Sequence, residues 1–136
     1  MYDLKHMDPV VHKRYTGVSN DLILDNLKAL SCRDAGIRIR FPLIPGVNDD
    51  RKNVEDTAAF LQRLHRVCYI DLLPYHDVAG SKYKRFGYTC RMGQLPASDP
   101  AHFQNIAETL SSYGLCVTMG GKEYERTYPQ AQTVEP

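Results

Sequence analysis

The sequence predicts an α/β fold in which parallel strands form one sheet and helices pack outside it. Apolar, strand-like runs begin near residues 2, 37, 67 and 115, and stretches with helical periodicity separate them. Because parallel neighbours can be joined only through a crossover, this alternation favours right-handed βα units. The 136 residues hold about three and a half such units, fewer than a closed eight-stranded barrel requires, so we expect a partial (β/α) barrel.

The first half of the chain contains two strand-like runs with helices between them. Asp8-Pro9 is a typical helix start, because aspartate caps a helix and proline fits its first position. Ile23, Leu27 and Leu30 then repeat at the spacing of one helical face. The expected elements are a strand at 2–5, a helix at 9–15, a helix capped by Ser19 or Asn20, and a strand at 37–44.

The second half repeats this pattern around one long irregular segment. Residues 75–97 lack periodicity, and a loop of this length in a compact domain is more often functional than idle. We expect one domain over 1–119 and a polar tail without regular structure over 120–136. The expected elements are a helix from Asp49 or Asp50 to about 65, a strand at 67–73, a helix that begins at Asp99-Pro100 and ends at Gly114, and a strand at 115–119.

Composition and charge exclude several classes of function. The net charge is +1, with 17 basic and 16 acidic residues, so no surface attractive to nucleic acid or to an anionic membrane is expected. No apolar stretch approaches the roughly 20 residues that span a bilayer, and residues 1–20 lack the apolar core of a signal peptide. We expect a cytoplasmic protein that binds neither nucleic acid nor membrane.

The four cysteines form no local cluster. They lie more than twenty residues apart, whereas zinc and iron–sulfur sites usually take two or more ligands from one short motif. We therefore expect no metal site among them and interpret them as buried or idle thiols. They are Cys32, Cys68, Cys90 and Cys116.

Polar side chains at the ends of the predicted strands are the candidates for chemistry. Asp3 and Lys5 flank Leu4, so both point to one face of the first strand. Arg40 lies on the next strand, and His76 follows the third. Because ligands of parallel α/β proteins bind at the carboxyl ends of the strands, we expect these four polar side chains to converge on one rim.

Each of these side chains also has a purely structural interpretation. Asp3 and Lys5 can form an exposed ion pair at a strand end, and such pairs are common and weak. Arg38 and Arg40 share a face, where a guanidinium group suits a carboxylate, a phosphate or a strand-end carbonyl. His76 can act as a base, a ligand or a hydrogen-bond donor.

Four blocks of sequence, in order and with matching gaps, resemble one family. From residue 1 to about Met119 the chain is similar to the C-terminal half of glycyl-radical enzyme activating enzymes, of the pyruvate formate-lyase activating type. The blocks are Tyr2-Asp3-Leu4-Lys5-His6-Met7-Asp8, then His12 to Asn20 with Thr16-Gly17-Val18, then Arg40 to Asp49 with Ile44-Pro45-Gly46, and Leu72-Leu73-Pro74-Tyr75-His76.

The resemblance implies the last three βα units of an incomplete (β/α)6 barrel of the radical S-adenosylmethionine class. It also implies an oxidoreductase activity. In this family a 4Fe-4S cluster, reduced by a donor such as flavodoxin or ferredoxin, reductively cleaves S-adenosylmethionine. The resulting 5'-deoxyadenosyl radical abstracts hydrogen from a glycine of the partner, which is a glycyl-radical enzyme.

Motif positions then imply roles for particular residues. Asp3 and Lys5 would contact the ribose and the carboxylate of S-adenosylmethionine, and Asp3 would also be a candidate ligand of a monovalent cation. His76 would lie beside the same cofactor, and Arg40 would reach either the cofactor or the glycine loop of the partner. The segment from Tyr75 to Tyr88, which includes His76, would flank that loop. No residue of the chain is assigned a catalytic role.

The sequence departs from the family pattern at the cluster. The C-x-x-x-C-x-x-C motif and the glycine-rich segment that grips the methionyl amine do not occur in it. Without three thiolates on one loop there is no site-differentiated iron. We therefore expect this polypeptide to be inactive alone and to function as part of a larger chain.

Two alternatives stay open at this point. A strand-end lysine such as Lys5 can form a Schiff base with a carbonyl substrate, which would indicate a fragment of a barrel aldolase. A half-barrel can also dimerise through its open first strand and bind a partner without catalysis.

Overall fold

The computed structural model describes residues 1–33, 36–75, 98–120 and 122–123. The strands among them form one five-stranded sheet in the order β1-β2-β3-β4-β5. β1 to β4 pair in parallel, and β5 pairs antiparallel with β4. The predicted parallel α/β sheet is therefore confirmed. The strands are β1 (Tyr2–Asp3), β2 (Ile37–Leu43), β3 (Val67–Pro74), β4 (Val117–Met119) and β5 (Lys122–Glu123), and the helices are α1 (Pro9–Thr16), α2 (Asp21–Ser31), α3 (Arg51–Gln62) and α5 (Pro100–Ser112).

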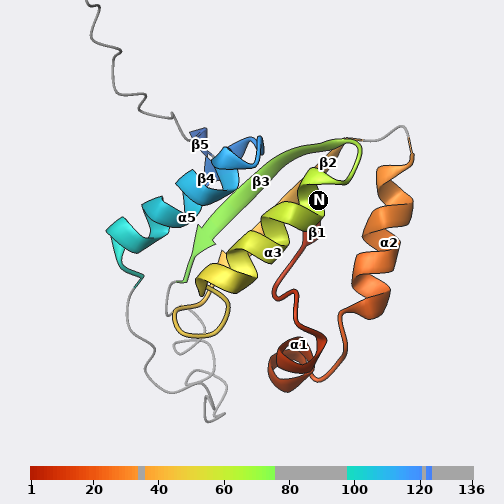
Figure 1. Ribbon diagram of the computed structural model, residues 1–136, viewed down its shortest axis with the longest axis horizontal. Helices are drawn as coiled ribbons and strands as arrows, with labels where there is room; N and C mark the ends of the chain where they lie inside the picture. Colours follow the sequence, from red (N-terminus) through yellow and green to blue (C-terminus); the bar gives the residue numbers. More distant parts are fainter. Residues whose placement is uncertain (34–35, 76–97, 121, 124–136) are drawn as a thin grey trace, which may run out of the picture.

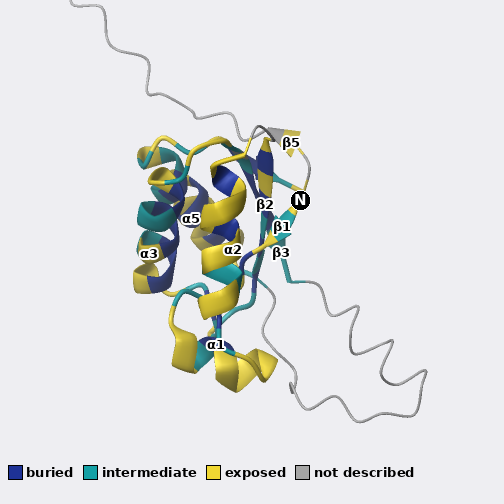
Figure 2. Ribbon diagram, turned by 90° about the vertical axis from the view of Figure 1, so that its right-hand side faces the viewer, coloured by how far each residue is buried: buried dark blue, intermediate teal, exposed yellow. Residues whose placement is uncertain are grey.

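The described helices lie on one side of the sheet, as Figure 2 shows. Along β2 every second residue is buried, because the inward residues face this helical layer and the others face away from it. The other face of the sheet carries no described helix (Figure 2). The buried apolar core joins Leu4, Leu27, Ile37, Ile39, Phe41, Leu43, Val54, Ala58, Leu61, Ile70, Leu72, Phe103, Ile106, Ala107, Leu110 and Val117.

Three predicted aspartate caps begin their helices. Asp8 Oδ1 accepts hydrogen bonds from the backbone N–H groups of Val10 and Val11, at 2.8 and 3.1 Å. These bonds hold the pKa of Asp8 below its ordinary value. Asp50 rather than Asp49 caps α3, and Asp99 caps α5. Capping residues follow from local chemistry, which is why the sequence locates these helix starts well.

Several element boundaries differ from those expected. β1 ends at Asp3 rather than Lys5, and α3 ends at Gln62 rather than near residue 65. The strand β5 was not expected, because it falls inside the segment 120–136 interpreted as a tail. The rest of that segment, apart from Gly120, lies outside the described residues, so the boundary at 119 stays a prediction.

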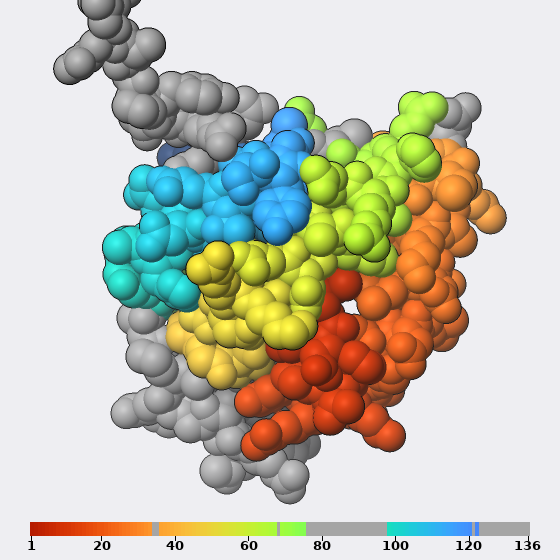
Figure 3. Space-filling view, in the orientation of Figure 1, coloured from red at the N-terminus to blue at the C-terminus, as the bar shows by residue number. Residues whose placement is uncertain are grey.

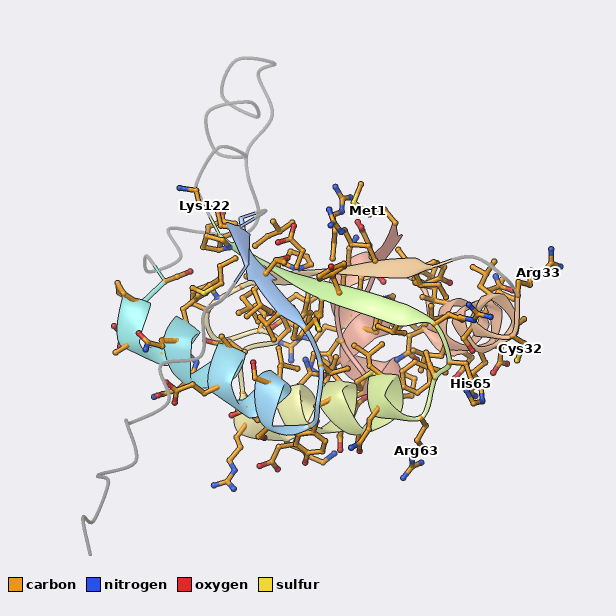
Figure 4. The ribbon with its side chains drawn as sticks, turned by 90° about the horizontal axis from the view of Figure 1, so that it is seen from above. Met1, Cys32, Arg33, Arg63, His65 and Lys122 are labelled. Carbon is orange, nitrogen blue, oxygen red and sulfur yellow. The ribbon has the colours of Figure 1, made fainter. Side chains whose placement is uncertain are left out.

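Of the cysteines interpreted as buried or idle thiols, the two whose side chains are described are not buried. Cys32 and Cys116 are exposed, free thiols. Cys32 follows the last residue of α2, where the chain leaves the helical layer, and Figure 4 shows it at the edge of the molecule near Arg33. No described helix combines the length and apolar character needed to cross a membrane.

Candidate functional site

The pairing of the carboxyl end of β1 with the middle of β2 brings Asp3 and Arg40 together. The two residues are register partners in the parallel ladder. Arg40 Nε donates to Asp3 Oδ1 at 2.7 Å, and Nη2 donates to Oδ2 at 3.0 Å, so the pair is bidentate. The side chains of Arg40 and Asp3 stay 40% and 42% exposed, which leaves the pair open to a ligand.

The charged side chains at this rim shift one another's pKa values. The hydrogen bond from Arg40 is the main reason that the pKa of Asp3 lies below its ordinary value, and the charge of Lys5 lowers it further. The same hydrogen bond raises the pKa of Arg40. Lys5 is exposed, and Leu4 between Asp3 and Lys5 is buried at 3% exposure. The structure thus places three of the four predicted rim residues near one another.

The fourth predicted residue, His76, lies outside the described residues. So does the segment 76–88 that was expected to flank a partner peptide. Tyr75, the last described residue before that segment, is partly buried and follows directly after the end of β3 at Pro74.

Arg38 shares the exposed face of β2 with Arg40 but has a different neighbour. Its guanidinium carbon lies 5.2 Å from the centroid of the Tyr69 ring, a cation–π arrangement across β2 and β3. Arg38 and Tyr69 are also register partners. This contact gives Arg38 a structural role beside the rim.

Sequence reasoning missed a second carboxylate on this face. Asp71 is the register partner of both Arg40 and Thr118, and it is only 9% exposed. Thr118 Oγ1 donates to Asp71 Oδ1 at 2.8 Å. After Asp3, the charge of Asp71 also contributes to the raised pKa of Arg40. The signal in the sequence was an acidic residue inside the apolar run of β3, on the face opposite Ile70 and Leu72.

A set of buried asparagines below the rim was also missed. Asn20, Asn48 and Asn53 are each 2% exposed. The side chains of Asn20 and Asn48 donate hydrogen bonds to the loop between β1 and α1, and that of Asn53 accepts one from it. Figure 3 shows the N-terminal segment, in red, lying against the yellow residues of α3. Met7 N–H donates to Asn53 Oδ1 at 2.8 Å across this contact.

A groove of about 820 Å³ opens between this loop, α1 and the turn after β2. Lys5, whose charge also lowers the pKa of Asp3, lines this groove, and Arg14 provides a second cation along its wall. Buried His12 closes the groove on the side of α1, and its Nδ1 lies 2.8 Å from the Val18 carbonyl oxygen. The lining residues are Lys5, His6, Val11, His12, Arg14, Tyr15, Thr16, Pro42, Ile44, Pro45, Gly46, Val47 and Asn48.

No group of three or more His, Cys, Asp or Glu side chains in the described part of the chain is arranged to hold a metal ion. Figure 4 shows the labelled Cys32 and His65 at the end of the sheet far from Lys122. The residues at the rim are suited instead to an organic ligand that carries both charged and hydroxyl groups.

Comparison with known proteins identifies the class and the family. No family model matches the chain. The chain is 38% identical over 126 residues to the (2S)-3-sulfopropanediol dehydratase activating enzyme of Klebsiella oxytoca, and 46% identical over 123 residues to the trans-4-hydroxy-L-proline dehydratase activating enzyme of Clostridioides difficile. Each alignment covers 89% of this chain and 40% of the relative, so the chain spans about 40% of the length of these relatives.

The fold is that of a solved activating-enzyme domain. The crystal structure of a domain of pyruvate-formate lyase-activating enzyme from Bacteroides vulgatus matches with a TM-score of 0.72 at 37% identity, over 88% of this chain and 65% of that chain. The sheet and its rim therefore define an α/β protein with part of the fold of radical S-adenosylmethionine enzymes.

The chain belongs to the family of glycyl-radical enzyme activating enzymes. The family resemblance seen in the sequence is thereby confirmed.

Proposed function

We propose that the rim formed by Asp3, Lys5 and Arg40 binds S-adenosylmethionine within an activating enzyme. The observation that supports this most directly is the exposed, bidentate Asp3–Arg40 pair at the carboxyl end of β1. An ion pair of this kind contributes little to stability at a surface, so its position at the binding edge of the fold favours a ligand-binding role.

The chemistry of these side chains fits the cofactor. S-adenosylmethionine presents a carboxylate, an ammonium group and two ribose hydroxyls. Lys5 and Arg40 provide cations for the carboxylate, and Asp3 can accept hydrogen bonds from the hydroxyls. Arg40 already holds both oxygens of Asp3, which fixes the carboxylate before a ligand arrives. His76 is proposed to lie beside the same cofactor, and Asp3 to be a candidate ligand of a monovalent cation.

The activity of the whole enzyme is part of the same proposal. Bound S-adenosylmethionine, together with a 4Fe-4S cluster and a reductant such as flavodoxin or ferredoxin, supplies the chemistry that removes hydrogen from a glycine of a glycyl-radical enzyme. In this chain Arg40, Tyr75 and His76 are proposed to meet the glycine loop of that partner. The sequence contains no cysteine-rich run, so none of its residues is assigned to the cluster.

Isothermal titration calorimetry of the chain with S-adenosylmethionine tests the cofactor site. We expect weak binding by the wild type and its loss in the Asp3→Ala/Lys5→Ala double variant. The matched control is Asp25→Ala/Lys28→Ala, which removes another exposed acid–base pair, 3.0 Å apart on α2, and should leave binding unchanged. Equal binding by the wild type and the rim variant would refute the assignment, and so would the absence of binding by the wild type.

A further inference from the structure

The ladder between β1 and β2 stops at a proline. Asp3 and Arg40 are register partners, and Leu4 N–H donates to the Arg40 carbonyl at 3.0 Å. In a parallel ladder the next bond would run from the N–H of residue 42 to the Leu4 carbonyl. Residue 42 is proline, which has no N–H, so the regular pairing cannot continue to Lys5.

Where this ladder ends, the side chain of Asn48 forms hydrogen bonds with the backbone of β2 and of the residue after it. Its Nδ2 donates to the Pro42 carbonyl at 2.7 Å, and its Oδ1 accepts from Ile44 N–H at 2.7 Å. In the extrapolated register, the backbone of His6 would make these two bonds with β2. The carboxamide of Asn48 therefore takes the place of a residue of β1 and satisfies two partly buried backbone groups that the interrupted ladder leaves unpaired.

The second Nδ2 hydrogen of Asn48 fixes Lys5 itself, because Nδ2 also donates to the Lys5 carbonyl at 2.8 Å. The next two carbonyls, those of His6 and Met7, accept from Asn20 Nδ2 at 2.9 and 2.7 Å. Asn53 donates through Nδ2 to the Asn48 carbonyl at 2.9 Å and accepts from Met7 N–H through Oδ1. Three consecutive carbonyls after β1 are thus held by buried asparagine side chains.

We infer that Asn48 is a positioning residue that fixes the backbone at Lys5 and thereby holds the Lys5 ammonium beside Asp3 and Arg40. This inference deepens the proposed function and rests on it for the role of Lys5. Asparagine suits the position because its short carboxamide provides two donors and one acceptor in one plane. Aspartate has the same shape but loses both donors, which makes Asn48→Asp the sharpest variant.

The wild-type chain provides the first test, through the side-chain amide hydrogens seen in NMR spectra. Both Nδ2 hydrogens of Asn48 should exchange with solvent at least about tenfold more slowly than those of Asn26, an exposed asparagine of α2. Equal exchange rates would overturn the inference, whether or not any variant folds.

The second test compares backbone amide exchange in Asn48→Asp with the control Asn26→Ala. Leu4 and Met7 should lose about tenfold or more of their protection in Asn48→Asp. Ile70, whose N–H donates to the Cys116 carbonyl in the middle of the sheet, should keep its protection. A purely structural role would lower protection at all three amides equally. That result would overturn the inference, as would unchanged protection at Leu4 and Met7.

Titration with S-adenosylmethionine then tests the link to Lys5. Asn48→Asp and Lys5→Ala should each weaken binding by about tenfold, and the double variant should bind no more weakly than either one. Losses that multiply in the double variant would show that Asn48 acts independently of Lys5 and would overturn the link. If the wild type does not bind, the proposed function fails, while the exchange data still decide whether Asn48 fixes the backbone at Lys5.

Discussion

Replacing Thr118 with valine should show how strongly the face opposite the helices depends on its buried carboxylate. Valine has nearly the shape of threonine, so the main change is loss of the hydroxyl that donates to Asp71 at 2.8 Å. Asp71 and Thr118 are 9% and 4% exposed, so water cannot easily replace the lost donor. A hydrogen bond to a charged group contributes about 1.5–3 kcal/mol, and we expect the free energy of unfolding to fall by about 2 kcal/mol.

Urea unfolding followed by circular dichroism measures this change, and in thermal unfolding it corresponds to a decrease in Tm of roughly 8 °C. Thr109→Val is the matched control, because its hydroxyl bonds only to the carbonyl of Asn105 in its own helix, and its cost should stay below about 0.5 kcal/mol. In an Asp71→Asn background the cost of Thr118→Val should fall by about half, since the acceptor is then neutral. A Thr118→Val cost equal to that of the control, or one unchanged by Asp71→Asn, would refute this reasoning.

Three further outcomes follow from the fold. Arg40 keeps the pKa of Asp3 below its ordinary value of 3.8, so this ion pair contributes stability above that pH and loses it as the pH falls through the lowered pKa. In Asp3→Asn, the Tm from thermal unfolding should therefore fall less steeply as the pH drops below about 4. A pH dependence equal to that of the wild type would count against the pair. Asp50→Ala removes the cap of α3 and should cost about 1 kcal/mol in urea unfolding, whereas a cost near zero would mean that the cap is dispensable. Leu110→Ala, at a fully buried position, should cost about 3 kcal/mol, while Leu22→Ala at 71% exposure should cost less than about 0.5 kcal/mol; similar costs would contradict the assigned core.

Features that depend on local sequence chemistry were predicted well. Alternating strand and helix patterns predicted the parallel sheet, and the aspartates before Pro9, Arg51 and Pro100 predicted three helix starts. The convergence of Asp3 and Arg40 followed from their places on neighbouring parallel strands. In each case a short stretch of chain, or the topology it implies, is enough to fix the outcome.

Features that depend on contacts distant in sequence were not predicted. Asn48 lies 43 residues from the Lys5 carbonyl that it binds, and no local pattern distinguishes it from an asparagine in an ordinary turn. The contact of Arg38 with Tyr69 and that of Thr118 with Asp71 both require the register between strands. The sequence places such residues on a face, and only the assembled sheet decides which partner each one meets.

Because the described helices cover one face of the sheet, alternate residues of β2 face either the apolar core or the opposite, uncovered face. Ile39 and Phe41 face the helices, where a change in side-chain volume disturbs packing. Arg38 and Arg40 point the other way, so substitutions there leave the apolar core in place and change instead the contacts with Tyr69 and Asp3. A library that randomises only the outward positions would therefore let ligand preference be redesigned on an intact scaffold.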